Sequence, residues 1–196
     1  MFDEIELGSE FFEWLSAIDS AIVTRAAAEA CPLCGGPLHR GDFARKPRGG
    51  VIAIAAEAFT RRFSLCCGRE GCRKRATPPS VRFLGRRVYA GAAVIVASVM
   101  ALVATTARAI RVATGIPART TRRWLRWWHG PFTTTRVFIE IAARLVPAVS
   151  RRSLPSSLLE RLEGEPSARV ATLLAWLAPL TTTSMPDGSR FVRGAM

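Results

Sequence analysis

The sequence is short of the residues on which most enzyme active sites depend. Its 196 residues include only 15 Asp and Glu and two His, His39 and His129, too few for a credible Ser–His–Asp set. A nuclease or transposase core needs several carboxylates that converge on two metal ions. After residue 30 the carboxylates are scattered, with no strand-rich segment to gather them: Asp42, Glu57, Glu70, Glu140, Glu160, Glu163, Glu165 and Asp187. We therefore expect no enzymatic activity from this chain alone.

Cysteine is too sparse for a disulfide-stabilised scaffold. Five cysteines in 196 residues are an odd number, so at least one has no partner within the chain. The N-terminus lacks a charged region followed by an apolar run and a cleavage site, which predicts a cytoplasmic protein. In a reducing compartment, paired cysteines more often bind metal than form disulfides.

Acidic residues are also unevenly distributed along a basic chain. The net charge is +13, made up of −6 in residues 1–30 and +19 in the remainder. Of the 28 basic residues, 26 are Arg, whose planar guanidinium binds phosphate and guanine edges better than Lys does. A surplus of this size favours a polyanionic partner, nucleic acid first.

The pattern along the chain divides it into four parts. Residues 1–30 predict an acidic N-terminal helix, 31–80 a cysteine module, 81–180 a helical domain and 181–196 a flexible tail. Breaks at Gly and Pro divide the helical domain into predicted helices at about 82–104, 106–114, 118–129, 134–146, 156–163 and 167–178. The fold class is therefore mainly α, with a small β module inserted near the N-terminus.

An uncharged run of 20 residues, 88–107, is long enough to cross a bilayer. It is rich in Ala and small polar residues, and Arg flanks both of its ends, so that no orientation across a membrane is favoured. We expect a buried core helix here and no membrane partner.

The cysteines form two pairs with the spacing of metal ligands. Cys31 and Cys34 are separated by two residues, and Cys67 and Cys72 by four, both within the range typical of zinc sites. The 32 residues between the pairs exceed the 15–20 of a compact four-cysteine site. We expect these four thiolates to bind one structural Zn²⁺ in a zinc ribbon. Cys66 remains a packed thiol or alternate ligand, and His39 could replace a thiolate.

A second motif lies at about residues 106–129. One helical pattern ends at Gly115, and another begins near Pro117, which is typical of a helix-turn-helix. At 100° per residue, four arginines of the second helix share an arc of about 100°: Arg119, Arg122, Arg123 and Arg126. The opposite side consists of packing residues: Thr121, Trp124, Leu125 and Trp128.

This division predicts a recognition helix that enters the major groove of DNA. Arg119, near the start of the helix, is best placed to read a base, whereas the other three arginines could read bases or contact phosphates. Trp127 lies on the flank, where it could pack against the sugar-phosphate backbone.

Two further basic clusters flank the cysteine module. We expect them to add phosphate contacts to the same nucleic acid: Arg73, Lys74 and Arg75 in the first cluster, and Arg82, Arg86 and Arg87 in the second.

Together these motifs resemble the small zinc-ribbon plus helix-turn-helix DNA-binding proteins of bacterial transposons and insertion sequences. The resemblance covers residues 31–130 and depends on the CPxCG motif at Cys31, the Cys67-x4-Cys72 pair with its trailing Arg-Lys-Arg, and the Thr-Thr-Arg-Arg-Trp-Leu stretch at 120–125. It implies binding to double-stranded DNA, such as the end of a mobile element, with Cys31, Cys34, Cys67 and Cys72 as zinc ligands.

The sequence thus predicts a zinc-containing, nucleoid-associated DNA-binding protein. It would be an accessory or regulatory component of a bacterial mobile element, and its protein partner would be a transposase or another protein of that element. Two alternatives stay open. One is an RNA-binding component of a ribonucleoprotein, and the other is a zinc-stabilised adaptor in a larger complex.

Overall fold

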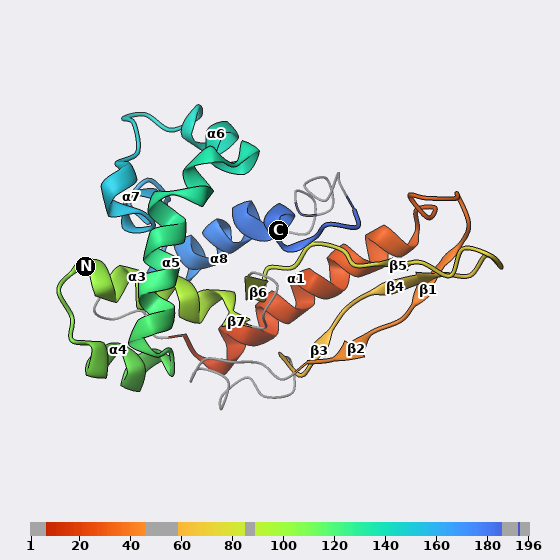
Figure 1. Cartoon of the computed structure of the whole chain (residues 1–196), viewed down its shortest axis with the longest axis horizontal. Helices are drawn as coiled ribbons and strands as arrows, with labels where there is room; N and C mark the ends of the chain where they lie inside the picture. The colour runs from red at the N-terminus through yellow and green to blue at the C-terminus, as the bar shows by residue number, and fades with distance from the viewer. Residues whose placement is uncertain (1–6, 46–58, 85–88, 186–191, 193–196) are drawn as a thin grey trace.

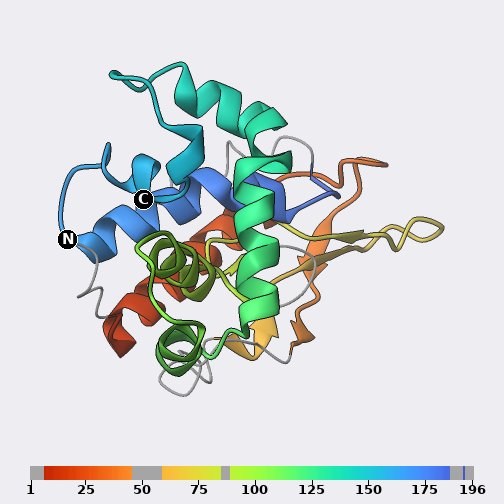
Figure 2. The same ribbon diagram turned by 60° about the vertical axis from the view of Figure 1, so that its left-hand side comes forward.

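The computed structural model describes residues 7–45, 59–84, 89–185 and 192. Within them helices predominate and the sheets are small and antiparallel, which confirms the mainly α class. In Figure 1 the strands that carry the cysteine module extend to the right of the view, whereas most helices gather at the left. Figure 2 shows the strands again projecting away from the helices.

Helix α1 (Ser9–Ala27) packs on the body of the protein through one apolar face. Phe11, Leu15, Ile18 and Ile22 recur at helical spacing and are all buried. The acidic N-terminal segment therefore includes an integral part of the hydrophobic core.

A buried ion pair joins α1 to a segment 63 residues further along the chain. The Asp19 carboxylate accepts hydrogen bonds from Ser80 Oγ (2.5 Å), the Val81 amide (2.7 Å) and Arg82 Nε (2.8 Å). Asp19 and Arg82 are both about 1% exposed. Arg82 was predicted to contact phosphate, and this prediction is wrong, because its guanidinium lies inside the core within 4.1 Å of the Phe63 ring centroid.

The strands form three small antiparallel sheets. One has the order β1-β4-β5, formed by Leu38–Arg40, Leu65–Cys67 and Arg75–Ala76. In the others, β2 (Phe43–Ala44) pairs with β3 (Arg61–Arg62), and β6 (Phe83–Leu84) with β7 (Tyr89–Ala90).

The β6–β7 pairing occupies the first part of the helix that was predicted at 82–104. Helix α3 (Gly91–Leu102) begins only at Gly91, whose amide donates to the Arg82 carbonyl oxygen at 2.8 Å. A Cβ at Gly91 would lie 2.5 Å from Leu174 Cδ2, so a larger residue at this position would displace the Leu174 side chain. Most of α3 is buried, as expected of a core helix.

The remaining helices follow the predicted order along the chain. They are α4 (Ala107–Thr114), α5 (Ala118–His129), α6 (Arg136–Ala142), α7 (Ser156–Leu159) and α8 (Pro166–Leu177), with short 3-10 turns η2 (Pro131–Thr134), η3 (Arg151–Ser153) and η4 (Ala178–Thr181). Across the described ranges, the helices are too short or too polar to cross a bilayer.

The first residues of the predicted flexible tail are fixed to the body. The Thr182 hydroxyl donates to the Thr77 carbonyl oxygen at 2.6 Å, and the Thr77 amide donates to Ser184 Oγ at 2.8 Å. Met185 is buried. The prediction of a tail from residue 181 is therefore wrong for 181–185, and nearly all of 186–196 lies outside the described residues.

Candidate metal centre and basic helix face

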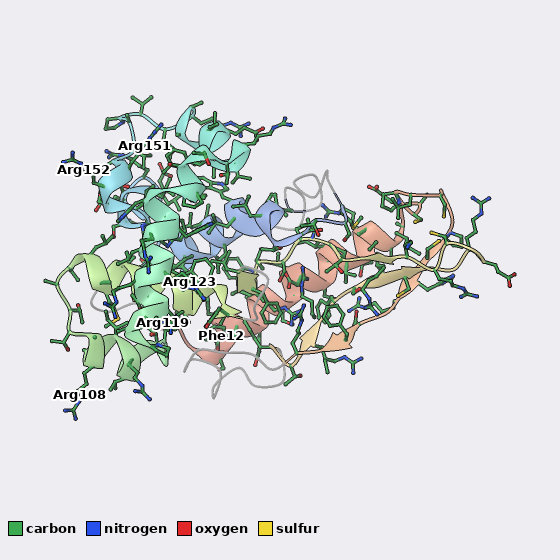
Figure 3. All side chains as sticks on the ribbon, in the orientation of Figure 1. Phe12, Arg108, Arg119, Arg123, Arg151 and Arg152 are labelled. Atoms are coloured by element: carbon green, nitrogen blue, oxygen red, sulfur yellow. The ribbon has the colours of Figure 1, made fainter. Side chains whose placement is uncertain are left out.

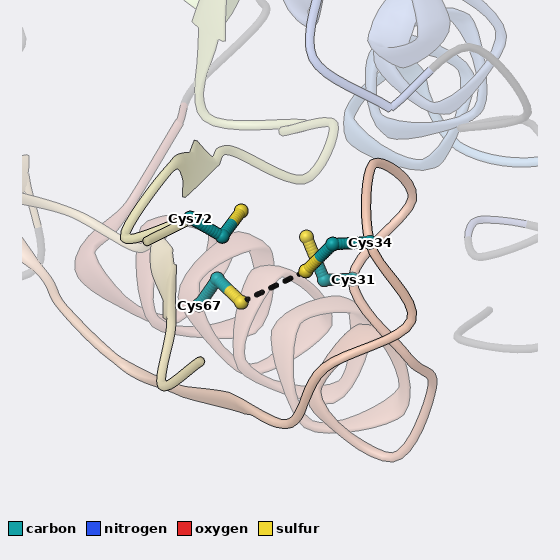
Figure 4. A group of neighbouring side chains, drawn as sticks. All are labelled: Cys31, Cys34, Cys67 and Cys72. Atoms are coloured by element: carbon teal, nitrogen blue, oxygen red, sulfur yellow. Dashed lines mark hydrogen bonds between the residues drawn. The ribbon is translucent and has the colours of Figure 1, made fainter. Parts of the chain in front are cut away.

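Four cysteine sulfurs meet at the end of α1. Cys31 and Cys34 lie in the turn after this helix, Cys67 ends β4, and Cys72 precedes β5. The four Sγ atoms all lie within 4.8 Å of one another, and Figure 4 shows them converging from two separate turns. The predicted set of four cysteines is thus brought together.

Strand pairing explains how two distant cysteine pairs become neighbours. The 32 residues between Cys34 and Cys67 include β1, β2 and β3. Because β1 pairs with β4 in the register Leu38 to Cys67, the chain returns to the first pair of cysteines. The long gap therefore forms strands that extend away from the sulfur cluster.

Backbone hydrogen bonds shape both turns around the sulfurs. The Cys31 amide donates to the Gly36 carbonyl oxygen at 2.8 Å, and the Arg69 amide donates to Cys67 Sγ at 3.4 Å. A hydrogen bond from the Gly36 amide lowers the pKa of Cys34 to about 7. A Cβ at Gly36 would lie 2.8 Å from Arg69 Cβ and 3.1 Å from Cys67 Sγ, so the turn requires glycine.

The four sulfurs lie close enough together to share one metal ion. Zn–S bonds of about 2.3 Å place the sulfurs of a tetrahedron roughly 3.8 Å apart, and Cys34 Sγ and Cys67 Sγ are 3.5 Å apart. Burial raises the pKa of Cys67 to about 12, a cost that a bound cation would offset by stabilising the thiolate. The four cysteines can therefore bind one metal ion.

The two alternative ligands lie outside this cluster. Cys66 precedes Cys67 on β4, so their side chains point to opposite faces of the sheet. A Cβ at Gly41 would lie 2.8 Å from Cys66 Sγ, and one at Gly68 would lie 2.5 Å from His39 Nε2. Both side chains therefore pack against glycines, and strand alternation selects Cys67 as the residue that joins the group.

Helices α4 and α5 are joined by a tight turn at Gly115. This glycine has φ of 64°, a left-handed conformation that favours glycine, and its amide donates to the Arg111 carbonyl oxygen at 2.8 Å. Thr114 and Ile116 on either side are buried. α5 then begins after Pro117, within a residue of the predicted start.

The two faces of α5 divide as the sequence predicts. Thr121 and Trp128 are buried, and the Trp128 Nε1–H donates to Ser98 Oγ of α3 at 3.1 Å. All four arginines of the predicted arc are exposed: Arg119, Arg122, Arg123 and Arg126. Figure 3 shows Arg119 and Arg123 along the helix.

The flank of α5 differs from the prediction. Trp127 is half-buried, and its ring lies 5.0 Å from that of Phe132 and 4.9 Å from that of Trp128. This aromatic cluster anchors α5 to η2, and Trp127 contributes to it by packing against Phe132 and Trp128.

The basic clusters beside the cysteine module have different environments. Arg73 and Lys74 are exposed on the loop after Cys72. Arg75 is exposed too, but its Nη1 donates to the Gly41 carbonyl oxygen (2.5 Å) and to Ser64 Oγ (3.0 Å). Arg86 and Arg87 lie outside the described residues.

Sequence reasoning left out three exposed arginines near α5, namely Arg108, Arg151 and Arg152. The sequence feature that could have identified them is the lack of acidic residues around them. Residues 71–139 contain 13 Lys and Arg and no Asp or Glu, and residues 141–159 also contain no Asp or Glu.

A comparison with protein-family models, curated proteins and solved structures gives no significant match, so the function of the chain has to be inferred from its cysteine group and its basic helix.

Proposed function

We propose that the chain is a zinc-containing protein that binds duplex DNA, with α5 as its recognition helix. The observation that carries this proposal is the division of α5 into an exposed arc of four arginines and an opposite face anchored in the core. A helix fits the major groove of B-DNA, where Arg forms bidentate hydrogen bonds with guanine and binds phosphates.

In this proposal α4, the turn at Gly115 and α5 act as a helix-turn-helix unit. α4 packs against α5, and α3 supports both from behind. Arg119 lies in the first turn of α5, the part of a recognition helix that reaches base edges, while Arg122, Arg123 and Arg126 follow along the same exposed side.

The metal has a structural role in the proposal. Zn²⁺ suits a site of four thiolates, and four protein ligands fill its coordination sphere, leaving no position for a substrate. The ion would link the turn after α1 to the β4–β5 turn and make a zinc ribbon of the β1-β4-β5 sheet. Exposed Arg73 and Lys74 on that turn are then held where they can contact a phosphate backbone.

A role as an accessory component of a bacterial mobile element is part of the proposal, and it rests on the resemblance of the motifs alone. The DNA-binding part rests on charge and exposure, and the two can be tested separately.

The decisive experiment measures the binding of the purified protein to duplex DNA as a function of salt concentration. Replacing Arg122, Arg123 and Arg126 with Ala should reduce the slope of log K against log salt by about 0.9 for each lost phosphate contact. Arg119→Ala should instead relax sequence preference, by about 1–3 kcal/mol at one base pair. Sequence preference is read by selection from a randomised duplex pool.

A matched control removes three charges outside the arc, through Arg136→Ala, Arg161→Ala and Arg169→Ala. Equal losses in the control and in the α5 variant would refute α5 as the binding element. Tighter binding to structured RNA than to duplex DNA at equal salt would favour the ribonucleoprotein alternative. Negligible binding to both nucleic acids at about 100 mM salt would favour the adaptor, since a protein with several phosphate contacts still binds there.

The metal is tested independently. We expect about one zinc ion per chain, and Cys31→Ser or Cys72→Ser should lose both the ion and folding stability. A protein that is fully folded without bound metal would refute the zinc site.

A further inference from the structure

Exposed cations are also present on a turn next to α5. η3 packs against α5, and it carries Arg151 and Arg152, both exposed. Figure 3 places these two arginines beyond one end of α5, with Arg108 of α4 near the other end and Arg119 and Arg123 between them. The exposed cations thus cover more than the recognition helix itself.

The fold fixes the position of η3. Leu154, the next residue, is fully buried, and Ser157 Oγ donates to the Ser150 carbonyl oxygen at 2.7 Å. The guanidinium of Arg151 lies 5.7 Å from the centroid of the buried Phe138 ring. Arg151 and Arg152 are therefore presented by a packed turn, so that ordering them on a ligand costs less entropy than ordering a loose tail.

The charge of this turn is not balanced by carboxylates nearby in the sequence. Residues 141–159 contain three arginines, Arg144, Arg151 and Arg152, and no Asp or Glu. Glu140, the nearest acid that precedes them, accepts a hydrogen bond from Arg136 Nε at 2.6 Å. A packed turn with this excess of positive charge suits an anionic partner.

The dimensions suggest where that partner lies. The 12 residues of α5 span about 18 Å, and the major groove is about 12 Å wide with a phosphate backbone along each side. A helix of this length that lies in the groove brings the elements beyond its two ends close to the backbones that border the groove. Cations beyond those ends face phosphates and do not face bases.

We propose that Arg151 and Arg152 contact the phosphate backbone on one side of the groove that α5 occupies, and that Arg108 contacts the backbone on the other side. This inference rests on the proposed DNA-binding function. It adds phosphate contacts to both strands, made by Arg108, Arg151 and Arg152, which together we call the clamp. It assigns to these residues affinity without sequence preference, in contrast to Arg119.

The test compares three variants of the full-length zinc-loaded protein on one duplex. Arg151→Ala with Arg152→Ala should reduce the salt slope by about 1.8 and weaken binding at 0.1 M salt by at least about tenfold, equally for all sequences in a randomised pool. Arg151→Lys with Arg152→Lys should retain most of the affinity, because Lys also binds phosphate as a point charge. Arg136→Ala with Arg161→Ala is the charge-matched control.

Hydroxyl-radical footprinting locates the contacts. Wild-type protein should protect both strands that border the groove, the Arg151 and Arg152 double variant should lose protection on one strand, and Arg108→Ala should lose it on the other. All three double variants should retain the thermal unfolding midpoint of the wild type, because the replaced side chains are exposed.

The outcomes separate this inference from the function on which it rests. If the triple α5 variant loses binding but the Arg151 and Arg152 variant matches its control in affinity, slope and footprint, the clamp is refuted and the DNA-binding function stands. If the triple α5 variant also matches its control, both are refuted. A change in sequence preference in the Arg151 and Arg152 variant would also refute the clamp, because it would mean base contact.

Discussion

Replacing Asp19 with Ala should destabilise the whole protein, because the Asp19 side chain joins α1 to the segment at residues 80–82. The Asp19 carboxylate accepts three hydrogen bonds of 2.5–2.8 Å from consecutive residues, Ser80, Val81 and Arg82. The substitution leaves Arg82 buried without this carboxylate.

The expected loss follows from the burial of both partners. Removing one member of a buried ion pair typically costs about 3–5 kcal/mol, because the remaining charge stays in a medium of low polarity. The guanidinium of Arg62, which is also buried and is stabilised by the charge of Asp19, adds to this cost. Burial lowers the pKa of Arg62 to about 10, and the charge of Asp19 opposes that fall. We therefore expect Asp19→Ala to reduce the free energy of unfolding by at least about 3 kcal/mol.

The assay is urea denaturation followed by tryptophan fluorescence and circular dichroism. Ser80→Ala is the milder variant, and it should cost about 1–2 kcal/mol because it removes the hydrogen bond to Asp19 and the one that Ser80 Oγ accepts from the Arg82 amide. Asp19→Leu combined with Arg82→Met should recover most of the stability, since apolar pairs often replace buried ion pairs without loss. A loss below about 1 kcal/mol for Asp19→Ala would refute the reasoning, because it would show that the pair is hydrated.

Three further predictions concern the metal turn and the support of α5. Cys67→Ser should abolish zinc binding, whereas Cys66→Ser should retain about one ion per chain, as measured by elemental analysis; loss of metal in both would contradict the strand alternation. Gly115→Ala should lower the free energy of unfolding by about 1 kcal/mol, because alanine is strained at positive φ; unchanged urea denaturation would contradict this. Ser98→Ala should cost about 1–3 kcal/mol by leaving Trp128 Nε1–H unpaired in the core, and an unshifted indole proton resonance in NMR would show that this bond is absent.

Local patterns in the sequence predicted the elements whose signals are themselves local. The apolar spacing of α1 and the buried and exposed faces of α5 follow from a period of 3.6 residues. The metal ligands could be chosen because spacing favours Cys67 over Cys66, and strand alternation confirms the choice.

The features that could not be predicted depend on contacts between distant residues. Arg82 has the same charge as its neighbours, and only its pairing with Asp19, 63 residues earlier, distinguishes it as a core residue. The β6–β7 pairing interrupts a run of apolar residues that fits a helix equally well, so α3 begins only after β7. The fixing of residues 182–184 to Thr77 is likewise a contact over more than 100 positions.

The pairing of Asp19 with Arg82 has a consequence for biosynthesis. Translation at about 5–20 residues per second takes roughly 3–13 s to proceed from Asp19 to Arg82. During that interval the apolar face of α1, which includes Phe12 and Leu15, emerges before Arg82, the partner of Asp19, has been synthesised. The Asp19–Arg82 pair can therefore form only after more than eighty residues have been made, and α1 reaches its final packing no earlier.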